Sequence, residues 1–143
     1  MKKHAQITGF YLETLLLIVV FISIILVLTQ VFGIGRAMSG RAELLTNAVC
    51  LAQNAAEAVS ASETPEEVAA LLNENGNARI SEGCVEACYD RDMRPAPEAP
   101  ALRVLVTWEP AADGMIYSTI TVTNGGDPVY SLDTAVYVGE VAA

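Results

Sequence analysis

Three cysteines are the side chains in this sequence best suited to covalent or metal chemistry: Cys50, Cys84 and Cys88. In an oxidising compartment, an odd number of cysteines leaves one thiol free. Cys84 and Cys88 can close a small disulfide ring; the alternatives are a bridge from Cys50 to either of them, or Cys50 as a small core residue. Their spacing is not that of a zinc finger, and the single histidine, His4, lies near the N-terminus. We therefore expect a candidate disulfide between Cys84 and Cys88 and no metal site.

Acidic residues cluster at four positions, Glu82, Glu86, Asp90 and Asp92. They lack the Asp-rich loop pattern with a central glycine that binds calcium, so we expect a solvated acidic face. No histidine follows residue 4 to activate a serine or a cysteine, and the chain has neither a G-x-S-x-G turn nor a glycine-rich phosphate loop. The sequence therefore predicts a protein that is not an enzyme and that needs no cofactor.

Composition and charge restrict the class of protein further. Hydrophobic residues make up 52% of the 143 positions and charged residues 17%, whereas soluble domains usually have about a quarter charged. The net charge of −9 is divided unevenly, with +3 over residues 1–41 and −12 over residues 42–143. Such an acidic segment repels phosphate backbones, so we expect no direct nucleic-acid binding. Its length allows one small hydrophobic core.

The excess apolar content is concentrated near the N-terminus. Between Phe10 and Ile34, Glu13 is the only residue that is charged at neutral pH. These 25 residues would extend about 37 Å as a helix, enough to cross a hydrocarbon core of about 30 Å. The block is too long for a signal peptide, and no small-residue cleavage site follows it. The sequence predicts a membrane-spanning helix over residues 10–34, with the N-terminus in the cytoplasm and the C-terminal domain outside.

The residues before and at the start of this helix carry a family resemblance. The stretch from Lys2 to Glu13, KKHAQITGFYLE, followed by the apolar block, resembles the N-terminus of type IV pilins and pseudopilins. In that family a short basic leader ends in glycine, a prepilin peptidase cuts after it, and the new N-terminal phenylalanine is methylated. The resemblance implies a leader over residues 1–9, cleavage between Gly9 and Phe10, and a role for Glu13 in subunit assembly. The family usually has its glutamate at the fifth mature position, and Glu13 is the fourth; cleavage after Thr8 would restore that spacing but put threonine where the peptidase expects glycine.

The glutamate offset fits a minor pseudopilin better than a major pilin. The resemblance implies a structural subunit of a type IV pilus-like, type II secretion or competence filament, assembled through its N-terminal helix. The partners implied are other pilin or pseudopilin subunits, the prepilin peptidase, a membrane-embedded assembly platform and the lipid bilayer. The alternative is an uncleaved single-pass membrane protein whose acidic extracytoplasmic domain binds a ligand or a partner.

Two helices are expected to position these residues. The first runs from about residue 10 to residue 60, because no proline interrupts it and an apolar stripe continues beyond the membrane segment. The stripe consists of Met38, Ala42, Leu45, Val49, Ala52, Ala56 and Val59. The second helix spans Pro65 to Glu74, because Thr64 and Glu67 form a capping box around a proline at the first helical position.

The rest of the chain has the alternation of β-strands. Residues 102–108 and 115–124 form a hairpin around the loop at 110–114, and a second turn at 124–128 leads to one or two strands over residues 129–141. Together these elements predict an α+β, pilin-like fold, in which a long N-terminal helix packs on a small antiparallel sheet of three to four strands. The predicted organisation is a leader at 1–9, a transmembrane helix at 10–34 and an extracytoplasmic globular domain at 35–143.

Overall fold

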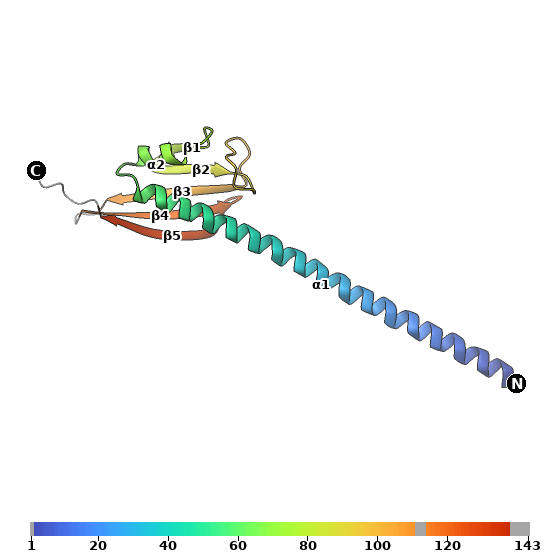
Figure 1. The fold of residues 1–143 in the computed structure, drawn as a ribbon. Helices are drawn as coiled ribbons and strands as arrows, with labels where there is room; N and C mark the ends of the chain where they lie inside the picture. The colour runs from blue at the N-terminus through green and yellow to red at the C-terminus, as the bar shows by residue number, and fades with distance from the viewer. Residues whose placement is uncertain (1, 111–113, 138–143) are drawn as a thin grey trace, which may run out of the picture. The chain divides into compact units, whose positions relative to one another are not determined.

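The computed structural model describes the backbone of residues 2–110 and 114–137. Its elements are α1 (Lys2–Ser60), α2 (Pro65–Leu72), β1 (Ala78–Ser81), β2 (Cys84–Tyr89), β3 (Leu102–Pro110), β4 (Met115–Asn124) and β5 (Asp127–Tyr137) (Figure 1). The chain divides into two compact units, one ending at Arg41 and the other beginning at Ala42. The prediction of one long N-terminal helix ending at Ser60 is confirmed.

The strands form one antiparallel sheet in which every strand lies beside the next one along the chain, in the order β1-β2-β3-β4-β5. The predicted count of three to four strands is wrong, because the sheet has five. The two strands that the sequence did not predict are β1 and β2. β1 has only 4 residues, and β2 is buried at five consecutive positions, so it lacks the polar alternation that marks a half-exposed strand.

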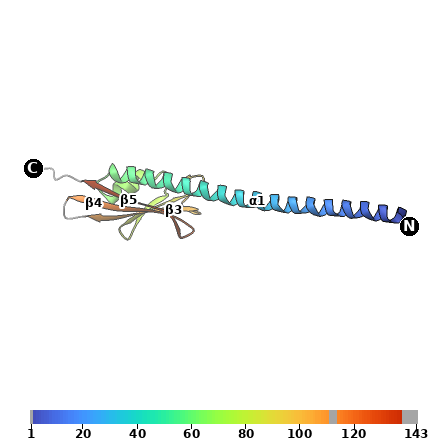
Figure 2. The same cartoon turned by 90° about the horizontal axis from the view of Figure 1, so that it is seen from below.

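The core of the second unit lies between one face of the sheet and the two helices (Figure 2). Ala48, Ala52 and Ala55 of α1 are at most 1% exposed, and their small side chains let the helix lie close to the strands. The strand residues of this core are Val85, Ala87, Tyr89, Leu102, Val104, Val106, Ile120 and Val122. Their period of two places the intervening residues on the opposite face of the sheet.

The predicted apolar stripe of α1 is only partly correct. Ala52 and Val59 are fully buried as expected, but Met38 and Leu45 are 67% and 48% exposed. Helical periodicity shows that residues share a face. It does not show at which residue that face meets a sheet, and here burial begins at Ala48.

Local signals placed α2 and the hairpins correctly. The Thr64 hydroxyl accepts a hydrogen bond from the Glu67 backbone N–H at 3.4 Å, and the Glu67 carboxylate accepts one from the Glu63 N–H at 2.9 Å. The helix ends two residues before the predicted Glu74, at Leu72, because the Asn73 side chain caps the following turn by accepting from the Gly76 N–H.

The predicted antiparallel pairing of β3 with β4 is confirmed, and so is the turn between β4 and β5. β3 and β4 pair antiparallel across the predicted hairpin, whose loop residues 111–113 lie outside the described part of the chain. Between β4 and β5, Gly125 and Gly126 have φ of 61° and 100°, which suits a tight two-residue hairpin turn. One strand, β5, follows this turn, and predicted strand residues 138–141 lie outside the described residues.

Candidate functional site

The N-terminal part of α1 exposes a continuous apolar surface. Its large hydrophobic residues from Phe10 to Ile34 are 46% to 74% exposed. An 18-residue window of the helix has a mean hydropathy of 3.0, and none of it is buried by the rest of the structure. A helix that is apolar on all sides needs a bilayer or other helices around it. By length and composition, α1 is therefore able to span a membrane.

The serine and threonine hydroxyl groups within this apolar segment are satisfied by the helix itself. Each donates a hydrogen bond to the backbone carbonyl oxygen four residues earlier, which removes the cost of placing it in an apolar medium. The three pairs are Thr14 to Phe10 at 2.9 Å, Ser23 to Val19 at 2.8 Å and Thr29 to Ile25 at 2.8 Å. Glu13 differs from them, because among the described residues it has neither a hydrogen bond nor an ion pair.

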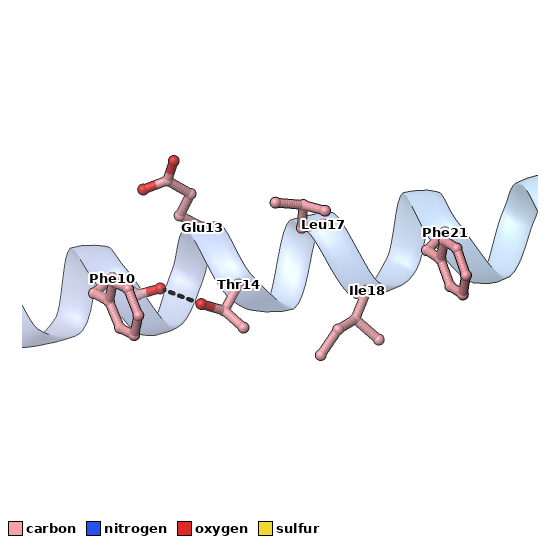
Figure 3. A pocket seen from close by; sticks show the side chains of 6 residues that line it. All are labelled: Phe10, Glu13, Thr14, Leu17, Ile18 and Phe21. Atoms are coloured by element: carbon pink, nitrogen blue, oxygen red, sulfur yellow. Dashed lines mark hydrogen bonds between the residues drawn. The ribbon is translucent and has the colours of Figure 1, made fainter.

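Glu13 lies in a shallow open groove along α1, with a volume of about 390 Å³. The other residues that line it are Phe10, Thr14, Leu17, Ile18 and Phe21 (Figure 3). Figure 3 shows the Glu13 carboxylate projecting on the same side of the helix as Leu17, away from Phe10 and Thr14. A lone carboxylate on an apolar surface suits a cationic group that approaches through an equally apolar environment.

The predicted processing residues Gly9 and Phe10 are consecutive residues of α1, and Phe10 lines this groove. A Cβ atom added to Gly9 would meet nothing within 4 Å, so close packing in the described structure does not explain a glycine there. Glycine inside a helix costs about 0.5–1 kcal/mol relative to alanine. Its presence at position 9 is therefore unfavourable for the helix, and no contact in the described structure compensates for it.

The cysteines do not form the predicted disulfide in this structure, where all three are free. Cys84 and Cys88 are the first and fifth residues of β2, so their Cα atoms are about 13 Å apart along an extended strand. A disulfide needs a separation of about 4.4–6.8 Å. The alternative bridge to Cys50 is also excluded by this fold, because Cys84 and Cys88 leave β2 on the face opposite the core that contains α1.

The acidic residues predicted to form a solvated face are not equivalent. Glu86 in β2 is only 8% exposed, and two arginines from the neighbouring strands neutralise its carboxylate. Arg79 Nη2 lies 2.6 Å from Glu86 Oε2, and Arg103 Nη1 lies 3.3 Å from Glu86 Oε1. The expectation was therefore wrong for Glu86. Within the described residues, no group of three or more histidine, cysteine, aspartate or glutamate side chains is placed to hold a metal ion.

Cys88 is expected to be the least reactive of the three thiols. It is 6% exposed, and its pKa is raised, first by burial and second by the nearby Glu86 carboxylate. A raised pKa leaves less thiolate at any pH below it, and the thiolate is the nucleophile. With iodoacetamide at mildly alkaline pH, we expect Cys88 to be alkylated at least about tenfold more slowly than Cys84, as measured by peptide mass spectrometry. Equal rates at the two cysteines would show that β2 opens readily.

A second groove, which the sequence did not indicate, lies in the unit that begins at Ala42. It has a volume of about 480 Å³ and is lined by residues from α1, the end of α2, β2 and the loop after β2. The lining residues are Cys50, Leu51, Asn54, Ala58, Leu71, Leu72, Glu74, Tyr89, Asp92 and Met93. No sequence motif marks it, because its residues come from segments far apart in the chain.

Comparisons of this chain with models of protein families, with curated proteins and with solved structures found no match.

Proposed function

We propose that this chain is a pilin-like subunit, of the minor pseudopilin type, that is stored in the membrane and polymerises through α1. The observation that supports this most is the single charged residue of the apolar segment over residues 10–34. Glu13 lies in an apolar groove without a partner in the described structure, three residues after Phe10, the residue that cleavage after Gly9 would make N-terminal. A protein that is only anchored in the membrane does not need a charge at this position. A subunit that packs against other subunits can use the charge to form an ion pair with a neighbour.

The proposed chemistry is a charge pairing between subunits. Removal of residues 1–9 exposes an ammonium group on Phe10, and this group pairs with the Glu13 carboxylate of a neighbouring helix. An unpaired charge is expensive in the apolar interior of a helix bundle, so the pairing favours one axial register of the stack. The serine and threonine hydroxyls of the same segment donate to backbone carbonyl oxygens and carry no charge, so Glu13 is the counter-charge that this segment offers to the ammonium group.

This function implies a topology and a set of partners. The chain crosses the cell membrane once, with its N-terminus in the cytoplasm and the domain from residue 35 onward outside. A prepilin peptidase processes it, and a membrane-embedded assembly platform moves it from the bilayer into a filament of pilin or pseudopilin subunits. The filament is of the type IV pilus-like, type II secretion or competence kind.

The proposal is tested by the intact mass and the N-terminal sequence of the chain from membranes, with and without a co-expressed prepilin peptidase. With the peptidase, we expect a product that starts at Phe10, keeps 134 of the 143 residues after loss of nine, and carries one extra methyl group. A product that starts at Gly9 would instead indicate cleavage after Thr8, which places Glu13 fifth in the mature chain.

A matched pair of glycine variants makes this test specific. Gly9 and Gly33 both lie in α1, and at both positions an added side chain has open space around its Cβ. Gly9→Leu is expected to block processing, and Gly33→Leu is expected to leave it unchanged. A chain that keeps residues 1–9 in every sample would contradict the proposal and favour the alternative, an uncleaved anchor whose acidic domain binds a ligand or a partner.

A further inference from the structure

The groove of about 480 Å³ combines apolar and acidic groups at the surface of the second unit. Leu71 of α2 and Met93 are 58% and 36% exposed, and both line the groove. Glu74 and Asp92 add two carboxylates, while no lysine or arginine is among its described lining residues. Carboxylates beside exposed apolar side chains let this concave surface contact both a cationic and an apolar group of a partner.

The loop that carries Asp92 and Met93 is held in place by specific hydrogen bonds. The Asp90 carboxylate accepts from the backbone N–H groups of Asp92 at 2.8 Å and Arg94 at 2.9 Å. Met93 has a φ of 60°, an uncommon conformation for a residue other than glycine. The Asn47 side chain ties the loop to α1 by donating to the Arg91 carbonyl oxygen at 2.8 Å. The Asp92 carboxylate takes no part in these bonds, so it is free to bind another group.

A surface of complementary character lies on α1. Met38, Arg41 and Leu45 follow one another at spacings of three and four residues, so they share one face of the helix. Met38 and Leu45 are 67% and 48% exposed, and Arg41 is exposed without an ion pair among the described residues. This basic and apolar stripe contrasts with the acidic and apolar groove, as the charge of +1 over residues 10–41, which remain after cleavage, contrasts with −12 over residues 42–143.

We propose that the groove of one copy of this chain binds the stripe formed by Met38, Arg41 and Leu45 on a second copy. Arg41 pairs with Asp92 and Glu74, while Met38 and Leu45 cover the exposed Leu71 and Met93. This inference rests on the proposed function, because it assigns a contact between subunits outside the membrane segment. The two surfaces differ, so the contact is heterologous; such contacts propagate from copy to copy and form open filaments unless they close into a ring.

The native Cys50, which lines the groove, allows a direct test in the full-length chain in membranes with the prepilin peptidase. In a Met38→Cys variant, a short bis-maleimide should link the new thiol to Cys50 of another copy. Ser39→Cys is the matched control, because it is exposed and lies about 160° around the helix from Arg41. We expect at least about tenfold more dimer for Met38→Cys than for Ser39→Cys, and loss of that dimer when Cys50→Ala is added. Equal yields, or a dimer independent of Cys50, would overturn the inference.

Charge exchange provides a second test in the Met38→Cys background. Arg41→Glu should lower the dimer yield about fivefold, the size expected for the loss of an exposed ion pair. Adding Asp92→Arg should restore the yield, because the two charges are then exchanged between the copies. The Asp90 side chain, which holds the loop, is unchanged in this variant. If Arg41→Glu leaves the dimer yield unchanged, and adding Asp92→Arg does not change it either, the pairing of Arg41 with Asp92 is contradicted.

A Leu17→Cys variant separates failure of this inference from failure of the proposed function. Leu17 lines the other groove, the one on the N-terminal part of α1 that contains Glu13. Cross-links between Leu17→Cys copies therefore report assembly of the N-terminal helices. If Leu17→Cys copies cross-link but Met38→Cys does not link to Cys50, the contact at the groove of about 480 Å³ is overturned and the proposed function is not. Absence of both would overturn both.

Discussion

Replacement of Glu13 by leucine is expected to reduce incorporation of the chain into assembled subunits by more than about 100-fold, because loss of one partner of a buried ion pair costs about 3–5 kcal/mol. The variant leaves the ammonium group of Phe10 without a counter-charge in the apolar bundle. Membrane insertion should not suffer, because leucine makes the helix more apolar. This variant therefore separates assembly from anchoring.

The measurement is the yield of Leu17→Cys cross-links in membranes, normalised to the amount of processed chain. Thr14→Val is the matched control, because it changes the neighbouring residue, whose hydroxyl is already bonded to the Phe10 carbonyl at 2.9 Å. We expect the control to remain within about twofold of the native chain, since an exposed substitution of this kind changes the free energy by about 0.5 kcal/mol or less. If Glu13→Leu also assembled normally, Glu13 would be a carboxylate at the depth of the lipid head groups, and the charge-pairing mechanism would be wrong.

Replacement of Leu102 by alanine is expected to lower the free energy of unfolding of the globular unit by about 3 kcal/mol. Leu102 is 0% exposed and is the first residue of the central strand β3, opposite Tyr89 on β2 and Asn124 on β4. Its loss would leave a cavity that these elements cannot fill. In a domain with a total stability of about 5–15 kcal/mol, a change of this size shifts the midpoint of unfolding substantially.

The single tryptophan provides the measurement for this prediction. Trp108 is half-buried and packs against the core, so its fluorescence during urea denaturation reports unfolding of the unit in the detergent-solubilised, full-length chain. Leu71→Ala is the matched control, because Leu71 is 58% exposed and its truncation should cost less than about 1 kcal/mol. Equal losses for the two variants would show that Leu102 does not lie in the core.

The elements that the sequence predicted correctly share one physical property: their signals lie within a short window of the chain. The capping box at Thr64 and Glu67 and the glycine turn after β4 depend on residues within a few positions of one another, and the apolar run of α1 is continuous along the chain. The strand count failed where this local signal was weak. β2 is buried on both faces, so its side chains do not alternate between polar and apolar.

The candidate site residues also differ in whether the residues that define them are near or distant in the chain. The roles of Gly9 and Phe10 in processing and of Glu13 in assembly were inferred from a family resemblance carried by twelve consecutive residues, and they stay predictions. The environment of Glu86 was not predicted, because its arginines are 7 and 17 residues away in the chain. The disulfide expectation depended on spacing alone, and the strand that contains Cys84 and Cys88 holds them too far apart.

The amino-acid order alone was sufficient to establish a long apolar N-terminal helix, a separate acidic domain of mixed α and β structure, and a charge placed unusually within the helix. These features depend on local periodicity, local steric preferences and the cost of a charge in an apolar medium. The fifth strand, the burial of Glu86, the exposure of Met38 and Leu45 and the acidic groove emerged from the folded chain. Each depends on which distant segments pack together, and that pairing results from the free energy of the whole core and not from any short stretch of residues.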